Sequence, residues 1–332
     1  MWKAKYELNR IFHDGTLDGD GVLNIEKIRI RDRKLMNTLL GVTLLGTGCP
    51  SVSTTRYGPA NLVQCCGLNL LIDIGSGATQ RLAGCGSSSA DIDALLITHI
   101  HSDHLVDLYQ FIISAWHQNR DRKQVIYGPP GIKTLVESTM AVWKAERELR
   151  IKWEKRTSIA AFEIEVHEMD CEGVIMEHEG SRVSAVKVEH QPVEPSFGFI
   201  FEAGGHKLAL SGDTRYSENL VEAAQETDIL VHEVFDHRSM KISGTRTKLG
   251  LANVAAYHTA STEVGKVAAQ ARAGCLVLTH IVPPHADRSG LLDSVRAEFS
   301  GPVIVGEDLM AIDVITGTVY WDNLAFNLPI RS

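Results

Sequence analysis

Residues 97–108 read ITHIHSDHLVDL and place three histidines and two aspartates between two apolar segments. Imidazole and carboxylate groups are costly to bury unless they are paired or bind a metal. His99, His101, Asp103 and His104 follow a predicted strand at spacings of 0, 2, 4 and 5, unlike the i, i+4 spacing of a zinc-protease helix. On a turn after a strand, the first two side chains can share one ion and the last two can address a second. These ligand types suit zinc, manganese or iron better than calcium.

Four local ligands cannot saturate two ions, so further ligands must come from distant parts of the chain. Three candidates each lie at a predicted strand end beside a turn: His190 in VEHQPVEPSFGF, Asp213 in LALSGDT and His280 in VLTHIVPP. The short carboxylate side chain of Asp213 is well suited to bridging two ions. The sequence therefore predicts a centre for two metal ions.

The rest of the chain alternates short strands and helices. From residue 39 onwards, short β-branched runs separated by Gly and Pro predict a strand meander, and helical patterns follow at residues 104–120 and 132–156. The second half repeats this mixture, which predicts an α/β (α+β) chain with two mixed sheets back to back and helices outside. Residues 1–37 are predicted to be an N-terminal extension, and residues 38–332 one catalytic domain with a helical insertion around 132–156.

Composition limits the possible settings and partners. The chain has 33 Lys and Arg against 41 Asp and Glu, a net charge of −8, and it has no block rich in basic residues. Nucleic acid is therefore expected to be an unlikely partner. No apolar signal segment and no run of 18 apolar residues is present. Because the six cysteines also lack paired spacing, we expect a reduced, cytoplasmic protein with no membrane contact.

The order of these motifs resembles the metallo-β-lactamase superfamily. HxHxDH after an apolar strand, a later His, SGDT, and TH after another strand appear in that order over residues 39–315, and Asp73 in LLIDIG matches the first motif. The resemblance implies a four-layer αββα sandwich with two Zn²⁺ ions along the sheet edges, although the ligand set also tolerates Mn or Fe. It implies that one ion is bound by His99, His101 and His190, the other by Asp103, His104 and His280, with Asp213 as the bridge.

Two further strings resemble ribonuclease Z. LVHEVF and YHTAST are similar to its HEAT and HST motifs, and arylsulfatases of the same fold have closely similar stretches. The resemblance implies that Glu233 and His258 relay a proton to the leaving oxygen, a role for a general acid with a pKa near the working pH. The alternative is that His258 only caps the next helical region while Glu233 binds a backbone amide. Asp103 is expected to orient the attacking hydroxide in addition to binding metal.

The loop GCPSVSTTRYGPANLV lies where ribonuclease Z carries a phosphate-contacting motif. Arg56 in this loop is a candidate substrate-binding residue for a sulfate or phosphate oxygen. It could equally be an ordinary surface arginine.

The ribonuclease Z resemblance also implies a long basic arm between the third-motif His and the bridging Asp. Only residues 191–212 lie there, they read as a plain hairpin, and they hold a single lysine, Lys207. GPPG and SGDTRYSENL, with a helix expected to start near Ser217, instead resemble the arylsulfatase-like group. The main hypothesis is thus a dinuclear zinc-dependent hydrolase of a small ester, best guess an aryl sulfate, using a metal-bridging hydroxide.

Three other functions remain open at this point. The first is a tRNA 3′-end processing endonuclease of the ribonuclease Z type, and the second is a lactonase or carboxylic ester hydrolase. The third is a metal-binding protein without catalysis. Trp143, Leu149 and Trp153 of the insertion suggest a lid, half of a dimer interface, or a helix simply packed on the outside. Since both related groups are commonly dimers, a homodimer is expected.

Overall fold

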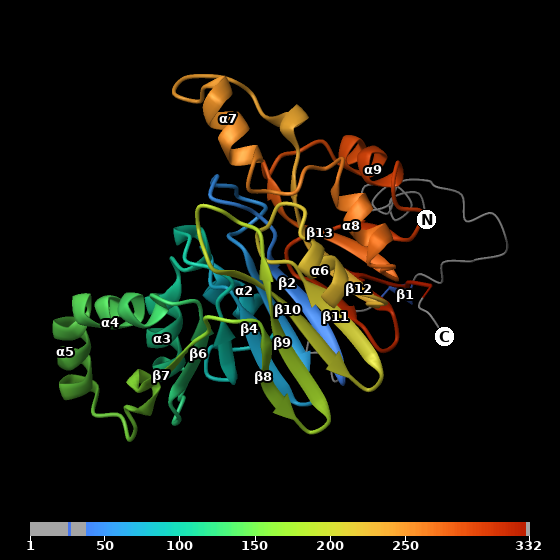
Figure 1. Cartoon of the computed structure of the whole chain (residues 1–332). Coiled ribbons are helices and arrows are strands. Elements are labelled where there is room, and N and C mark those ends of the chain that lie inside the picture. The colour runs from blue at the N-terminus through green and yellow to red at the C-terminus, as the bar shows by residue number, and fades with distance from the viewer. Residues whose placement is uncertain (1–25, 28–37, 330–332) are drawn as a thin grey trace.

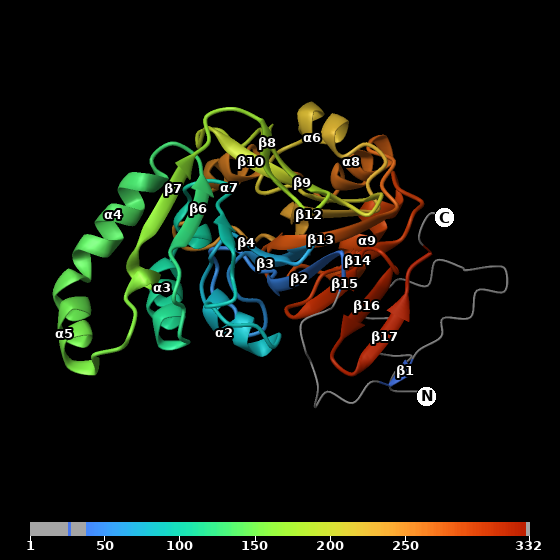
Figure 2. The same cartoon turned by 90° about the horizontal axis from the view of Figure 1, so that it is seen from below.

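The computed structural model describes residues 26–27 and 38–329. The strands in this part of the chain form two sheets that pack face to face, and helices cover the outer face of each sheet (Figures 1 and 2). The expected α/β sandwich with four layers in the order αββα is therefore confirmed. Its strands and helices have the bounds given next.

The first sheet is mixed, and its neighbouring strands follow one another in the order β1 (Glu26–Lys27), β17 (Leu324–Asn327), β16 (Thr318–Trp321), β15 (Met310–Asp313), β2 (Leu40–Gly46), β3 (Ala60–Cys65), β4 (Leu68–Ile72), β5 (Ala94–Leu96), β6 (Gln124–Gly128) and β7 (Ile164–Glu168). The second sheet has the order β14 (Val303–Val305), β13 (Cys275–Val282), β12 (Ile229–Phe235), β11 (His206–Leu210), β10 (Ser196–Ala203), β9 (Ser181–Val188) and β8 (Gly173–His178). In both sheets antiparallel hairpins adjoin parallel strands joined by helices.

The helices divide between the two outer faces. The first sheet is covered by α2 (Ala78–Gly84), α3 (Leu108–His117) and α4 (Ile132–Val142), from which α5 (Lys144–Glu154) continues outward. The second sheet is covered by α6 (Glu218–Ala223), α8 (Val264–Gln270) and α9 (Arg288–Arg296). Helix α7 (Lys248–Ala255) stands apart beyond the ends of β12 and β13 (Figure 1).

The core between the sheets is built from alternating side chains. Phe197, Phe199 and Phe201 of β10 are fully buried and pack with Leu40 and Val42 of β2 in one apolar cluster. Alternate residues of a strand point to one face, so each strand contributes every second side chain to this layer. β13, the central parallel strand of the second sheet, is buried along its whole length, as expected for a strand covered on both faces.

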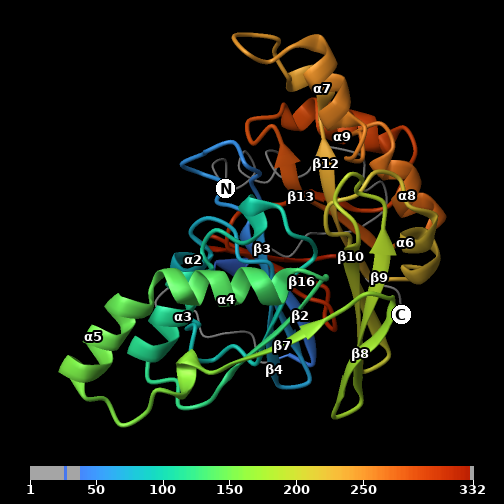
Figure 3. The same cartoon turned by 60° about the vertical axis from the view of Figure 1, so that its left-hand side comes forward.

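The predicted helical insertion around residues 132–156 consists of two helices. α4 ends at Val142, and Trp143 stacks on Tyr109 with the two rings 4.9 Å apart. α4 buries Ile132 and Val136 against the first sheet, whereas α5 has no buried residue and stands away from the sheets (Figure 3). The homodimer expectation, for which this surface is one candidate, stays a prediction.

Most of the predicted extension, residues 1–37, lies outside the described residues. Its one described element is β1, which pairs with β17 at the edge of the first sheet. Over residues 26–27 and 38–329, no helix is both long enough and apolar enough to cross a membrane.

Candidate metal centre

The seven predicted ligands come together although they are spread over 182 positions of the sequence, from 99 to 280. They follow strands of both sheets: β5 leads to the HxHxDH turn, β9 to His190 and β11 to Asp213, while His280 lies within β13. Every strand delivers its ligand at the same edge of the sandwich. This edge is therefore the candidate metal centre.

The first group of ligands consists of three histidines. His101 Nδ1 lies 3.0 Å from His99 Nε2 and 3.2 Å from His190 Nε2. His99 and His190 are fully buried, and His101 is half-buried. Three ring nitrogens that converge in this way can hold one transition-metal ion.

The second group consists of Asp103, His104 and His280. Asp103 Oδ2 lies 3.7 Å from His104 Nε2 and 3.5 Å from His280 Nε2. All three of these atoms are buried and have no hydrogen-bond partner among the described residues. Buried polar atoms without a partner are rare in proteins. Three such atoms that lie close together fit a site for a metal ion.

Asp213 lies between the two groups. Its Oδ2 is 3.9 Å from His99 Nε2 and 4.0 Å from His190 Nε2 on one side. On the other side it is 3.4 Å from His104 Nε2 and 3.2 Å from His280 Nε2. One carboxylate within reach of both groups is the geometry that a bridging ligand requires.

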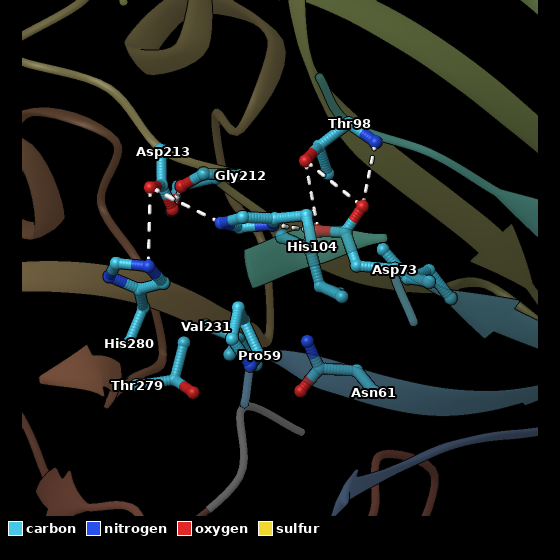
Figure 4. Close-up of a pocket in the computed structure, with 13 residues that line it drawn as sticks. Pro59, Asn61, Asp73, Thr98, His104, Gly212, Asp213, Val231, Thr279 and His280 are labelled. Carbon is cyan, nitrogen blue, oxygen red and sulfur yellow. Dashed lines mark hydrogen bonds and ion pairs between the residues drawn. The ribbon is translucent and has the colours of Figure 1, made fainter. Parts of the chain in front are cut away.

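Asp73 supports His104 from behind. Its Oδ2 accepts a hydrogen bond from His104 Nδ1 at 2.8 Å, and its Oδ1 accepts one from the Thr98 backbone N–H at 2.8 Å. Figure 4 shows His104 held between Asp73 and Asp213. Because Nδ1 is the donor in this bond, Nε2 is free to face the centre, the usual arrangement for a metal-binding histidine.

His280 is aimed by an irregularity in the sheet. β12 and β13 are in register up to the pair Glu233 and Thr279, and the next pair is Val234 and Ile281, so His280 is the extra residue of a bulge. Its φ of 39° is in the left-handed region. Bulges commonly re-aim a side chain next to active sites, and here the bulge turns the ring toward Asp213.

Burial and charge separate the pKa values of the centre. Burial holds the pKa of His99 well below its ordinary value, so its ring is neutral and its lone pair available. Burial would do the same to His104, but the carboxylates of Asp213 and Asp73 raise the pKa of His104 well above its ordinary value. Burial tends to raise the pKa of Asp213, yet the surrounding imidazoles, His280 and His104 first, hold it well below its ordinary value.

Glu233 and His258 form a buried pair beside the ligands. His258 Nδ1 lies 2.9 Å from Glu233 Oε1, and this oxygen also accepts hydrogen bonds from the backbone N–H groups of Thr214 and Thr259 at 3.1 Å each. Burial tends to lower the pKa of His258, but the Glu233 carboxylate outweighs it and raises the pKa to about 9. His258 also lies within reach of His190 and Asp213. Glu233 thus both orients His258 and binds backbone amides.

Arg56 is buried, and its guanidinium is bonded to other parts of the protein. Its side chain is buried, and Nη1 donates to Thr47 Oγ1 and to the Gly306 carbonyl at 2.6 Å each. Nη2 donates to Glu307 Oε1 at 3.0 Å. The guanidinium therefore fixes the loop to the segment around Glu307, which contradicts the expected surface position, while substrate binding by Arg56 stays a prediction.

Tyr257 is a site residue that the sequence reasoning missed. Its backbone carbonyl accepts a hydrogen bond from His190 Nδ1 at 2.8 Å, and its half-buried ring lies 5.0 Å from the His190 ring. Its one signal in the sequence is its place directly before His258. Tyr257 therefore orients a candidate ligand and forms part of the wall of the centre.

Comparisons with known proteins agree with this geometry. The family model described as anti-Pycsar protein Apyc1 matches residues 40–245. A protein of Mycobacterium bovis named ribonuclease Z is 34% identical over 284 residues, which cover 83% of this chain and 99% of that protein.

Solved structures share the fold. The short form of human tRNase Z matches with a TM-score of 0.63 at 24% identity, covering 82% of this chain and 99% of that one. The metallo-β-lactamase fold protein YhfI from Bacillus subtilis also gives a TM-score of 0.63, at 20% identity, and covers 82% of this chain and 98% of its own.

Proposed function

Because the chain belongs to the anti-Pycsar Apyc1 family and is a relative of ribonuclease Z within the metallo-β-lactamase fold, we propose that it is a metal-dependent hydrolase of phosphodiester bonds in RNA. Its proposed substrate is a precursor tRNA, cut at the 3′ end. The observation that carries the proposal is the paired centre, in which Asp213 faces two ligand groups and the Glu233–His258 pair lies alongside.

The aryl sulfate hypothesis is wrong, and the comparison with ribonuclease Z overturns it. That hypothesis depended on the missing arm, and the stretch between His190 and Asp213 is indeed only the β10–β11 hairpin. However, the alignment with the mycobacterial ribonuclease Z is 284 residues long. It covers 99% of that protein and 83% of this chain. An alignment this compact leaves no room in that ribonuclease Z for a long arm that this chain lacks. The missing arm therefore does not argue against a relationship to ribonuclease Z.

The expectation that the partner is a small ester and that nucleic acid is unlikely is wrong for a related reason. It used the net charge of −8, which describes the whole chain. Relatives named ribonuclease Z contradict it. Phosphate contacts depend on the local field of a surface, and an acidic protein can present a basic patch to a polyanion.

In the proposed centre, His99, His101 and His190 would hold one ion and Asp103, His104 and His280 the other, with Asp213 shared. Two divalent ions at such a site supply Lewis acidity toward a phosphoryl oxygen and lower the pKa of water. Zinc is the proposed metal, because imidazole nitrogen predominates among the ligands. The carboxylate of Asp103 is also proposed to orient the attacking water.

The proposed role of His258 is to protonate the leaving oxygen of the cleaved bond. Its Nδ1–H donates to Glu233, which fixes the ring and stabilises its protonated form. Nε2 is then the atom left to give up a proton, and the ring lies beside those of His190 and His280. Since a ribose hydroxyl is a poor leaving group unless it is protonated, the reaction has a use for this acid.

The test compares four substrates on protein loaded with zinc, each with and without a chelator. They are a precursor tRNA, bis(p-nitrophenyl) phosphate, a ribonucleoside cyclic phosphate as a minimal diester, and an aryl sulfate. We expect chelator-sensitive cleavage of the precursor at its 3′ end, and Asp213→Ala serves as the inactive control. Turnover of a small diester with the precursor left intact would overturn the RNA proposal while leaving the phosphodiesterase chemistry in place.

A further inference from the structure

One segment beside the candidate metal centre is basic, although the chain as a whole is acidic. The α7 segment, residues 237–257, links the end of β12 to His258 and contains no aspartate or glutamate, although the whole chain has 41. It carries Arg238, Lys241, Arg246 and Lys248. Figures 1 and 3 show α7 standing out beyond the ends of β12 and β13. The segment is therefore a basic projection on an otherwise acidic molecule.

Three of these basic side chains are available to a partner. Lys241, Arg246 and Lys248 are exposed, and within the described part of the chain they form no ion pair. Arg238 differs, because its guanidinium pairs with Asp236 at 3.1 Å and bonds to Ser294 Oγ and the Gly290 carbonyl at 2.6 Å each. Arg238 thus anchors the segment, while the other three present their charge to solvent.

The segment is also attached to the candidate metal centre. Its underside, including Leu251 and Val254, packs against a buried cluster that contains Phe235 and Val282, the last residues of β12 and β13. At its far end the Tyr257 carbonyl accepts the hydrogen bond from His190. The segment is therefore anchored at both ends, and at Tyr257 it contacts a candidate ligand directly.

We propose that the α7 segment is the RNA grip of this chain, with Lys241, Arg246 and Lys248 contacting phosphates that flank the cleaved bond. This inference rests on the proposed function and adds where the substrate is held. The β10–β11 hairpin cannot serve, since its one lysine, Lys207, is bonded to the Gln225 carbonyl. A polyanion is the partner that fits best, because three exposed cations that form no ion pair within the described residues can contact successive phosphates.

The test measures RNA binding directly. A labelled precursor tRNA is titrated in the presence of a chelator, so that nothing is cleaved, and fluorescence anisotropy is recorded at several salt concentrations. In the variant Lys241→Ala/Arg246→Ala/Lys248→Ala we expect binding to weaken roughly tenfold or more, and the salt slope to fall by about one per lost phosphate contact.

A matched control removes three positive charges elsewhere. Lys133, Lys144 and Lys152 are exposed residues of α4 and α5, which lie at a different end of the molecule (Figures 1 and 3). Their triple alanine variant changes the net charge by the same amount and should bind RNA almost as wild type does. Equal weakening in both variants would mean that only total charge matters, and it would overturn the grip.

Two other results would also overturn the grip. One is an unchanged affinity and salt slope in the α7 variant. The other is unchanged RNA binding together with a smaller particle by light scattering, which would assign the exposed Ile242 and Leu249 to a second copy of the chain. Cleavage of the precursor by the wild type is scored separately. A wild type that binds RNA through the α7 segment without cutting it would refute the proposed function and keep the grip.

Discussion

Replacing Asp73 by Asn tests whether the support behind His104 controls metal binding. Asp73 has a φ of 59°, a left-handed conformation that Asn adopts readily, so the substitution leaves the backbone unstrained. What changes is one oxygen, which becomes an amide N–H₂ group. The Asp73 carboxylate now accepts from His104 Nδ1 and from both the backbone N–H and the hydroxyl of Thr98.

Asn cannot satisfy both neighbours. If its oxygen faces the Thr98 N–H, its amide nitrogen faces His104 Nδ1, and the ring must move its proton to Nε2, the atom needed by the metal. If the amide turns round, two N–H donors face each other at Thr98, which costs about 1–3 kcal/mol for a buried group. We therefore expect metal affinity to fall about 10–100-fold, as for other partners of metal-binding histidines, which equals about 1.4–2.7 kcal/mol.

The assay is competition for zinc against a chromogenic chelator, with the ion content measured by mass spectrometry. Asp308→Asn is the matched control, because the largely buried Asp308 carboxylate also accepts from a threonine and from backbone N–H groups, those of Thr47 and Tyr57, and contacts no candidate ligand. It should lose stability and keep its zinc affinity. If Asp73→Asn binds zinc within twofold of wild type, the proposed role of Asp73 is refuted.

Three further predictions concern the shared ligand and the proton relay. Asp213→Ala should abolish turnover and leave one bound ion or none, as measured by mass spectrometry. Two tightly bound ions in this variant would contradict the bridging role of Asp213. His258→Ala should slow precursor tRNA cleavage far more than bis(p-nitrophenyl) phosphate hydrolysis, because nitrophenolate leaves without protonation, and equal slowing would contradict the acid role. In metal-free protein the pKa of His258 is raised from 6.5 to about 9, so folding favours the protonated ring. This contribution to stability is complete below about pH 6.5 and is lost as the pH rises through about 9. Urea unfolding at the two ends of this window should show a decline of up to about 3 kcal/mol, and the decline should shrink in Glu233→Gln.

The sequence by itself determined the local cluster of candidate ligands and the layers of the fold. His99, His101, Asp103 and His104 are close in the chain, so a single turn after β5 brings them together in any fold that keeps the turn. The same holds for local patterns such as Ser217, which caps α6 at the position where a helix was expected to start. Local spacing and periodicity depend on covalent geometry, which sequence alone fixes.

Tertiary structure decided which side chains meet across the sandwich. The sharing of Asp213 between two groups requires β5, β9, β11 and β13 to end at one edge, and the aim of His280 depends on a bulge that its own sequence does not announce. Arg56 looked available because its loop is polar, yet the fold surrounds it with Thr47, Gly306 and Glu307, two of which are about 250 positions away.

The substrate was misjudged for the same physical reason. Net charge can be summed from the sequence, but the field that a phosphate meets depends on where each charge lies. Only the folded chain shows that residues 237–257, which the sequence gives as free of acidic residues, form a projection attached to the candidate ligand His190. The sequence therefore predicted the residue types that cluster locally. The contacts between distant residues and the local electrostatic field at the candidate metal centre arise only when the chain folds.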